Sequence, residues 1–362
     1  MQIHLVIPGL IWPGASLVAP AAGIELPALA RLLGLGRREH RDFEPLDLQL
    51  ARLFGLGTGS SGDPLPLAAL RRLGESAPVA PDPGGDWLCA DPVNLSFARE
   101  HLLLNDFPAD ELGDDDVCAL IAALNDHFAD LGRFEACTPT RWYLRLAAPT
   151  RARLFPLHDV IGRPIRQFLP EGDDARRWQR TMNEVQVLLH NHPLNQAREA
   201  AGRRPANSLW FWGAGMLETA PAATLPAVQA AEPLARGMAR AAGAEAVTPD
   251  LAAALREDTV VVLDTLLHPA RQLDLDGWRS NLTMLERDWI APLAGALGDG
   301  RVQKLTLTAP GDRGTFELVV RAGERWKFWR KPLAFDALLK SLTPAAPSLP
   351  AEPVTDPGPA PR

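Results

Sequence analysis

The sequence is poor in cysteine and contains no long apolar run. Its three cysteines, Cys89, Cys118 and Cys137, are odd in number and widely spaced, without the spacing of a zinc site. This usage excludes a disulfide scaffold and is typical of reduced thiols in a cytosolic protein. No apolar stretch reaches the roughly 20 residues of a membrane span, and residues 3–12 are too short and unflanked for a signal peptide. We therefore expect a cytoplasmic protein with no membrane association.

The sequence also lacks an excess of positive charge and a phosphate-binding lysine motif. A formal net charge of −7 argues against a nucleic-acid partner held by bulk electrostatics. The Gly/Ser-rich run at residues 57–63 has no lysine and no P-loop spacing, which favours a flexible loop over a phosphate cradle. One tyrosine against ten tryptophans, with much Ala, Leu, Arg and Pro, indicates a GC-rich bacterial genome.

Helical and strand patterns alternate along the chain, whose 362 residues allow two domains. The order strand, strand, helix, strand within residues 87–146 indicates a compact α+β unit of a size suited to an inserted domain. The Pro- and Ala-rich tail at 343–362 is expected to be disordered. Other strands are predicted at residues 3–7, 208–212, 259–263 and 302–308, helices at 26–33, 46–56, 66–73, 276–297 and 334–342, and a hairpin at 316–329 that turns near Ala322 and Gly323.

Residues 190–215 hold the densest group of polar side chains in the sequence, next to the apolar-aromatic run Leu209-Trp210-Phe211-Trp212. The pattern predicts a helix, a loop, a buried strand and a Gly-x-Gly turn, and such turns face ligands in open α/β sheets. His190 and His192 cannot point the same way on a helix, so structural hydrogen bonding is favoured over metal binding. The candidate ligand-binding residues here are His192, Asn195, Arg198 and Asn207. Arg198 and Asn207 either meet an anion or tie the helix to the strand.

Three further features outside this stretch are candidates for function. Arg141, on a predicted strand, contacts a phosphate or carboxylate, or else forms a surface ion pair. His158 and Asp159 form either an aspartate-oriented histidine or the cap of a turn. The basic, aromatic segment 321–331 could bind an anionic partner or single-stranded nucleic acid, although a half-buried edge hairpin with a solvated basic face is favoured.

The order of these pieces resembles the archaeal-type cofactor-independent phosphoglycerate mutases. The resemblance is carried by the segment NHPLNQAREAAGRRPANSLWFWGAG at 191–215 and by LIAALN, RWYL and HDVIG at 120–125, 141–144 and 158–162. The resemblance implies the alkaline phosphatase superfamily: an α/β core sheet flanked by helices, with a smaller inserted α+β domain. The corresponding domains are 1–85 and 171–342 for the core and 86–170 for the insertion.

The sequence departs from the family where the family's metal chemistry resides. A metal-binding aspartate is implied after the first strand, where this chain has Pro8-Gly9-Leu10. The implied serine nucleophile is absent from residues 50–55, and the implied late Asp-His pair corresponds to Ala309-Pro310-Gly311-Asp312. Two-metal phosphoryl transfer needs several such ligands together with a nucleophile. The chain is thus similar to the degenerate bacterial branch labelled RpfE-type regulatory proteins.

These observations lead to three hypotheses about function. The first is a non-catalytic, regulatory phosphoglycerate mutase-like protein without cofactor, which binds a phosphorylated or carboxylated metabolite or a protein partner. The second is an active mutase or phosphatase that uses a divalent metal such as manganese on displaced ligands. The third is an interaction module built on the segment 316–331. The displaced ligands of the second hypothesis would be Asp264, His268, Asp274, Asp276 and Asp312.

Overall fold

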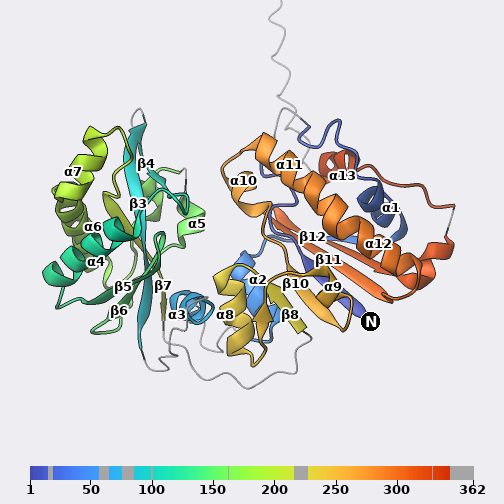
Figure 1. The fold of residues 1–362 in the computed structure, drawn as a ribbon, viewed down its shortest axis with the longest axis horizontal. Coiled ribbons are helices and arrows are strands. Elements are labelled where there is room, and N and C mark those ends of the chain that lie inside the picture. Colours follow the sequence, from blue (N-terminus) through green and yellow to red (C-terminus); the bar gives the residue numbers. More distant parts are fainter. Residues whose placement is uncertain are drawn as a thin grey trace, which may run out of the picture.

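The computed structural model describes residues 1–14, 19–56, 65–75, 85–98, 101–161, 163–215, 227–327 and 329–342. These residues form two β-sheets with helices packed on them (Figure 1). The larger sheet has seven strands in the order β2-β12-β11-β1-β10-β8-β9, of which β11, β1, β10, β8 and β9 run parallel. Its strands are β1 (Gln2–Val6), β2 (Arg37–Arg41), β8 (Ala227–Ala230), β9 (Ala246–Val247), β10 (Thr259–Val262), β11 (Lys304–Gly311) and β12 (Gly314–Arg321).

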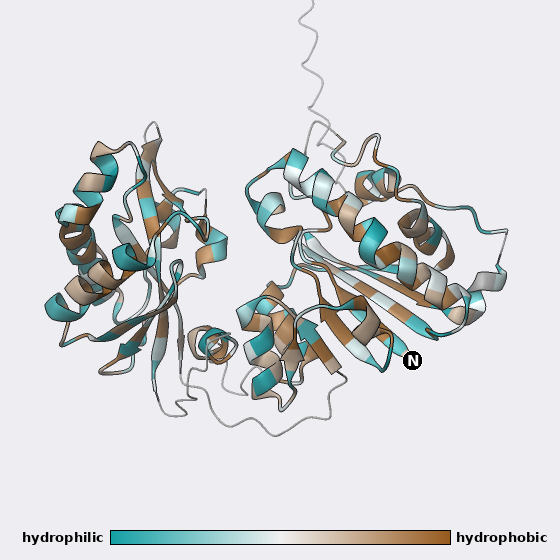
Figure 2. Cartoon of the chain, in the orientation of Figure 1, coloured by the Kyte–Doolittle hydropathy of each residue, from teal (hydrophilic) through white to brown (hydrophobic). Residues whose placement is uncertain are grey.

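Helices cover both faces of the larger sheet because its central strands are apolar on both sides (Figure 2). Leu5 and Val261 face one helical layer, and their neighbours Val6 and Val262 face the other. The first layer comprises α1 (Pro27–Leu35), α11 (Leu275–Leu285), α12 (Ala291–Gly298) and α13 (Phe335–Leu342). The second layer comprises α2 (Leu46–Leu53), α3 (Leu67–Leu73) and α8 (Pro233–Ala241).

The smaller sheet is antiparallel and has five strands in the order β4-β3-β6-β5, with β7 paired to β3. Helices α4, α6 and α7 lie on its outer face, and α3 and α5 lie on the side toward the larger sheet (Figure 1). The elements are β3 (Trp87–Ala98), β4 (His101–Asn105), β5 (Gly132–Thr138), β6 (Arg141–Leu146), β7 (Ser208–Gly215), α4 (Asp114–His127), α5 (Leu157–Val160), α6 (Ala175–His190) and α7 (Pro193–Ala200).

Helix α3 joins the two sheets through backbone contacts that only glycine permits. A Cβ added at Gly237 in α8 would lie 1.6 Å from the carbonyl oxygen of Leu70 in α3. On the other side, Gly213 of β7 has φ +73°, and its Cβ would lie 2.8 Å from the amide nitrogen of Ala68. Both contacts belong to one continuous hydrophobic core that extends from the larger sheet into the smaller one.

The predicted α/β fold class is confirmed, but two details differ. The hairpin predicted at 316–329 is wrong, because β12 pairs with β11 through a turn between Gly311 and Gly314, and Ala322–Trp326 form a 3₁₀ helix. Strand β7 lies in the smaller sheet, although its residues follow 170, the limit predicted for the inserted domain. The expected loop at 57–63 and the tail at 343–362 lie outside the described residues.

Candidate functional site between the two sheets

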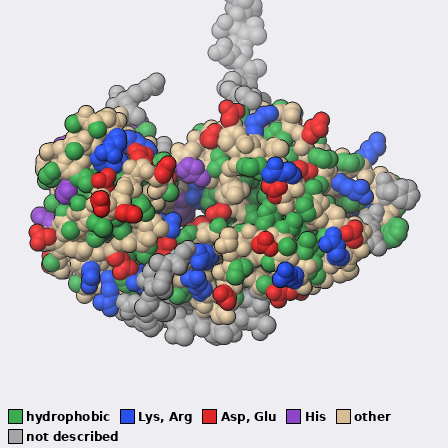
Figure 3. All heavy atoms as spheres, in the orientation of Figure 1, with side chains coloured by type: hydrophobic (Ala, Val, Ile, Leu, Met, Phe, Trp, Pro, Cys, Tyr) green, Lys and Arg blue, Asp and Glu red, His purple; other side chains and the backbone are tan. Residues whose placement is uncertain are grey.

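The carboxyl ends of the parallel strands of the larger sheet point toward a hollow between the two sheets, which Figure 3 shows with histidine and basic side chains beside it. Glu232 follows β8 and Asp264 follows β10, so both carboxyls stand at this edge. In open α/β sheets, ligands bind in the crevice outside this edge. The hollow is therefore the candidate functional site.

The described residues 7–14, which follow β1, contribute no ionisable side chain to this edge. Gly9 has φ +78°, and a Cβ there would lie 2.6 Å from the carbonyl oxygen of Leu266 in the loop after β10. The carbonyl oxygen of Gly9 accepts a hydrogen bond of 2.8 Å from Nε1 of the buried Trp278. Close packing of backbone and indole thus occupies the position where the family resemblance implies a metal-binding aspartate.

Four acidic side chains from four segments lie close together at this edge, and burial raises the pKa of each. They are Asp47 in the first turn of α2, Asp159 in α5, Glu232 and Asp264. Proximity between carboxyls adds to the effect, since Asp47 raises the pKa of Asp159 and Asp264 raises that of Glu232. Oδ1 of Asp47 is buried without a hydrogen-bond partner among the described residues. Such a group of perturbed carboxyls in a crevice marks a functional-site candidate.

Arg271, in α10 (Leu267–Arg271), is the cation of this group. Burial lowers the pKa of Arg271, although the negative charges of Asp159, Glu232 and Asp47 raise it in part. Its guanidinium makes no ion pair or hydrogen bond within the described part of the chain. The five donors of an arginine side chain are suited to a carboxylate or phosphate, so Arg271 can anchor an anionic ligand.

His158 and Asp159 lie side by side on α5, but they do not form an ion pair at neutral pH. Nε2 of His158 is 3.8 Å from Oδ1 of Asp159. Burial, followed by the charges of Arg271 and Arg71, lowers the pKa of His158 to about 3, so its ring is uncharged. The ring packs edge-on against Trp212 with 5.9 Å between centroids. His158 therefore offers the hollow a neutral hydrogen-bonding ring.

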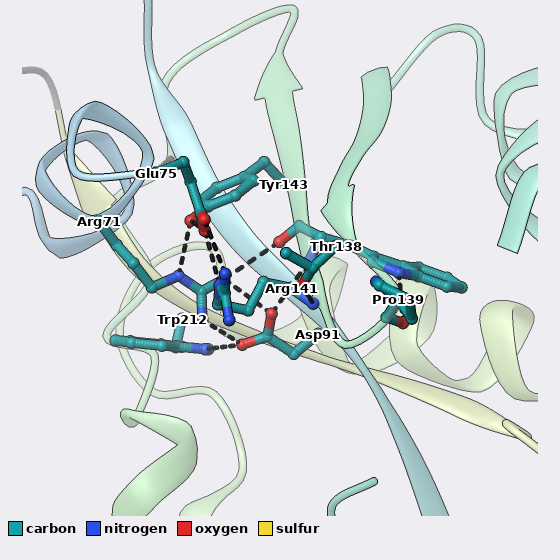
Figure 4. Close-up of polar contacts among 9 residues, drawn as sticks. Arg71, Glu75, Asp91, Thr138, Pro139, Arg141, Tyr143 and Trp212 are labelled. Atoms are coloured by element: carbon teal, nitrogen blue, oxygen red, sulfur yellow. Dashed lines mark hydrogen bonds and ion pairs between the residues drawn. The ribbon is translucent and has the colours of Figure 1, made fainter. Parts of the chain in front are cut away.

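A buried ion pair links α3 to the smaller sheet (Figure 4). The guanidinium of Arg71 donates to both carboxylate oxygens of Asp91 on β3, at 2.8 and 2.7 Å. The same carboxylate accepts hydrogen bonds from Nε1 of Trp212 at 2.9 Å and from the backbone nitrogen of Trp142 at 3.2 Å. Every oxygen of this buried anion is satisfied, which offsets its desolvation.

Arg141, predicted to contact a ligand or to form a surface ion pair, belongs to the same network. Its Nε and NH2 groups donate to the two carboxylate oxygens of Glu75 at 2.8 and 2.9 Å. The hydroxyl of Tyr143 donates to Glu75 at 2.7 Å and accepts from Nε of Arg71 at 3.0 Å. These hydrogen bonds, led by that from Arg141, outweigh burial and lower the pKa of Glu75.

The four candidates from residues 190–215 have partners within the smaller lobe. Arg198 is buried and donates to Asp116 at 3.0 Å and to the carbonyl oxygen of Arg204 at 3.0 Å. Asn195 donates to the carbonyl oxygens of Leu189 and Ala206, and Asn207 exchanges two hydrogen bonds with the backbone of Leu95. Nδ1 of His192 accepts from the amide of Leu194 at the start of α7. These contacts connect the helix to the strand, which was one of the two roles predicted from the sequence. The other role, ligand binding by these residues, stays a prediction.

The side chains at the strand ends do not fit a two-metal centre. Within the described ranges, no group of three His, Cys, Asp or Glu side chains is placed to hold a metal ion. Two of the displaced ligands considered above are engaged elsewhere: Asp274 accepts from the amide of Gly277, and Asp312 accepts from the amide of Gly14. Paired metals need several such ligands around each ion.

The fold and the hollow define an α/β protein with a crevice at the carboxyl edge of its larger sheet. Residues 90–195 match the family model of 2,3-bisphosphoglycerate-independent phosphoglycerate mutase. The 2,3-bisphosphoglycerate-independent phosphoglycerate mutase 2 of Methanothermobacter thermautotrophicus is 32% identical over 145 residues, 39% of this chain and 35% of that protein. A probable mutase of Geobacter sulfurreducens is 34% identical over 128 residues, 34% of this chain and 31% of that protein. The chain thus spans about a third of these relatives, and the predicted resemblance to the family is confirmed.

A solved structure shows a similar fold over most of the chain. A protein from Pyrococcus horikoshii has a TM-score of 0.50 at 15% identity, over 93% of this chain and 91% of that one. The cofactor-independent phosphoglycerate mutase from Thermoplasma acidophilum has a TM-score of 0.47 at 17% identity, over 93% of this chain and 94% of that one.

In the described part of the chain, no helix is both long and apolar enough to span a membrane.

Sequence reasoning missed Asp47, Glu232 and Arg271. Glu232 could have been found, since it stands before Pro233 and so carries the signature of a helix N-cap; its side chain accepts from the amide of Ala235. Asp47 and Arg271 carry no local signal, because each is one charged residue in a short helix. Only the tertiary fold brings them together.

Proposed function

We propose that this chain is a phosphoglycerate mutase-like protein without metal-dependent catalysis, which binds a phosphorylated or carboxylated metabolite and acts as a regulator. The observation that carries the proposal is the edge formed by β1, β10 and β11. There the described residues supply Pro8-Gly9-Leu10, the lone carboxyl Asp264 and the backbone-bound Asp312. A two-metal reaction has neither its ligands nor its nucleophile among these groups.

The binding half of the proposal rests on the unengaged side chains of the hollow. Arg271 lies near several carboxyls but makes no direct ion pair with any of the described residues, which leaves its guanidinium donors available to a phosphate or carboxylate. The free oxygen of Asp47 and the neutral ring of His158 suit the hydroxyl groups of a sugar acid. One anionic group surrounded by hydroxyls is therefore the chemistry that we assign to the ligand.

The catalytic half is tested by a mutase and phosphatase assay on the purified protein, with added manganese and with chelator, alongside metal analysis. We expect no turnover in either condition. Turnover that manganese supports and chelator abolishes would overturn the proposal and favour the alternative, a metal-dependent mutase or phosphatase with displaced ligands.

The binding half is tested by calorimetric titration with 3-phosphoglycerate. We expect saturable binding that Arg271→Gln weakens by about tenfold or more, because a hydrogen-bonded charge pair is lost. Arg256→Gln, an exposed arginine after α9 (Leu251–Ala254), is the matched control and should bind as the wild type does. Equal affinities of the two variants would exclude Arg271 as the anchor.

A further inference from the structure

A second pocket lies at the β2 edge of the larger sheet and takes no part in the hollow described above. It has a volume of about 570 Å³, a size typical of small-molecule sites. We call it the α1–β2 pocket. It is lined by Gly34, Gly36, Arg37, Arg38, Glu324, Arg330 and Lys331.

The backbone around the pocket is held by close contacts with the end of α1. A Cβ at Gly34 would lie 2.3 Å from the carbonyl oxygen of Lys331, so the chain after the 3₁₀ helix packs directly on the helix. NH1 of Arg330 donates to the carbonyl oxygen of Leu35 at 2.6 Å, which satisfies the C-terminal end of α1. The pocket is therefore a built feature of the fold.

The pocket carries an uncompensated positive charge. Its one carboxylate, Glu324, forms an ion pair of 3.1 Å with Lys327, outside the lining. In contrast, Arg38 and Lys331 have neither an ion pair nor a side-chain hydrogen bond within the described residues. Arg330 has only a neutral carbonyl as partner. At least three cations thus face the pocket without a counter-ion.

The positive surface continues from the pocket along the sheet. Lys304 of β11 stands directly opposite Arg321 of β12, and both line two further pockets. One of these shares Arg37 with the α1–β2 pocket and also contains the carboxylates of Glu39 and Glu317, so its cations still outnumber its anions. Like charges directly opposite each other on neighbouring strands destabilise a sheet. A chain of net charge −7 nevertheless concentrates cations here, which a bound anion would stabilise.

Two large aromatic residues are close to the pocket residues in sequence. Trp326 and Trp329 are 69% and 67% exposed, and they lie in sequence between the pocket residues Glu324 and Arg330. Exposed indoles beside clustered cations are the combination that holds an aromatic base next to a phosphate.

We propose that the α1–β2 pocket binds a small nucleotide with more than one phosphate, with the phosphates on Arg38, Arg330 and Lys331. The base stacks on an exposed indole of Trp326 or Trp329. The volume favours a small molecule over a polymer, and the number of unpaired cations favours a polyphosphate over a single carboxylate.

The test is calorimetric titration of the full chain with ATP, inorganic pyrophosphate and a short oligothymidylate. We expect saturable ATP binding that Arg38→Glu and Lys331→Glu each weaken by about tenfold or more. One of the variants Trp326→Ala and Trp329→Ala should weaken ATP binding and leave pyrophosphate binding unchanged. Arg133→Glu, on an exposed arginine of β5, is the matched charge control. Arg271→Gln, which changes the hollow and not this pocket, should bind ATP as the wild type does.

The proposal is overturned if ATP does not bind saturably, or if Arg38→Glu binds it as tightly as Arg133→Glu does. Tighter binding of oligothymidylate than of ATP would identify a nucleic-acid surface instead. If pyrophosphate binds as tightly as ATP, the base makes no contribution and a nucleotide is excluded as the specific ligand. If the glutamate variants lose their near-ultraviolet circular dichroism, Arg38→Gln and Lys331→Gln replace them and must show the same weakening.

Discussion

Single residues in the hollow are tuned by burial more than by direct pairing. Asp47, Asp159, Glu232 and Asp264 have raised pKa values whose largest cause is desolvation, and desolvation likewise lowers the pKa of His158 and Arg271. Burial thus weakens charge of both signs at this site. A ligand that brings one anionic group and several hydroxyls meets one cation and several groups that accept or donate hydrogen bonds.

The lowered pKa of His158 predicts a pH-dependent loss of stability. The pKa of His158 in the folded protein, about 3, lies below the usual histidine pKa of 6.5, so the unfolded chain takes up the proton first as the pH falls. His158 therefore contributes stability that is present above about pH 6.5 and is lost progressively toward pH 3. Between about pH 7.5 and 5, the wild type should lose up to about 2 kcal/mol that His158→Gln does not lose.

Urea unfolding at the two pH values measures this difference. His101→Gln, at an exposed histidine of β4, is the control and should follow the wild type. If His158→Gln loses as much stability as the wild type on acidification, the buried neutral state of His158 is wrong.

Secondary-structure elements meet most closely where α3 packs between α8 and β7. Gly74 of the α3 terminus and Gly237 of α8 let the two backbones touch, since a Cβ at Gly74 would lie 1.7 Å from the carbonyl oxygen of Pro233. Arg71 leaves the same helix toward Asp91 on the other side. One short helix therefore sets the spacing between the two sheets, and with it the width of the hollow.

Enlarging this helix contact should destabilise the protein. Gly237→Ala places a methyl group against the carbonyl oxygen of Leu70, and we expect a loss of about 1–3 kcal/mol in the free energy of unfolding. Gly295→Ala is the matched control, because its Cβ in α12 would meet nothing within 4 Å. There a gain of up to about 1 kcal/mol is expected from helix propensity alone. Denaturant titration of both variants measures the contrast, and equal effects would contradict the tight contact.

Helices and strands with a clear hydrophobic pattern could be predicted from the sequence. Strands whose position depends on pairing with a strand far away in the sequence could not. The buried strand β10 and the amphipathic helix α4 lie where their patterns predicted them. Strand β2 was missed because its sequence, RREHR, has no apolar face and is held only by pairing with β12. Strand β7 was expected in the core sheet, yet its all-apolar sequence fits equally well beside β3, where it pairs.

The same limit applies to the candidate site. Residues 190–215 were predicted to bind a ligand because polar side chains are concentrated there. In the structure, Asn195 and Arg198 make hydrogen bonds within the smaller lobe instead. The hollow, by contrast, collects one or two residues from each of several distant segments. Local density of polar residues is therefore a poor guide to this site, and the ends of the parallel strands are a better one.

At the scale of the whole molecule, the two sheets share one apolar core. That core runs from Val6 and Val262 through α3 to Trp212 and Trp142 without interruption. Only the far layer of the larger sheet, with Leu5 and Trp278, forms a separate cluster. The hollow is consequently bounded by two lobes that are joined through buried side chains, with an ion network at the joint.

A shared core predicts cooperative unfolding of the two lobes. Far-ultraviolet circular dichroism and tryptophan fluorescence should give coincident urea transitions, since both lobes contain buried tryptophans. Trp278→Phe removes the buried tryptophan of the larger lobe, so the remaining buried tryptophans all lie in the smaller lobe: Trp87, Trp142, Trp178, Trp210 and Trp212. The fluorescence midpoint of this variant should still match its circular dichroism midpoint. Two separated transitions would show that the lobes unfold independently.

The position of α3 also determines how the chain can be cut. Its residues precede the smaller lobe in sequence, yet they cover the inner face of β7 and β3 and supply Arg71 to the buried Asp91. A fragment that began at Trp87 would leave that face bare and that carboxylate without its counter-ion. An autonomous version of the smaller lobe must therefore start upstream of Leu67, carrying with it a helix that topology alone would assign to its neighbour.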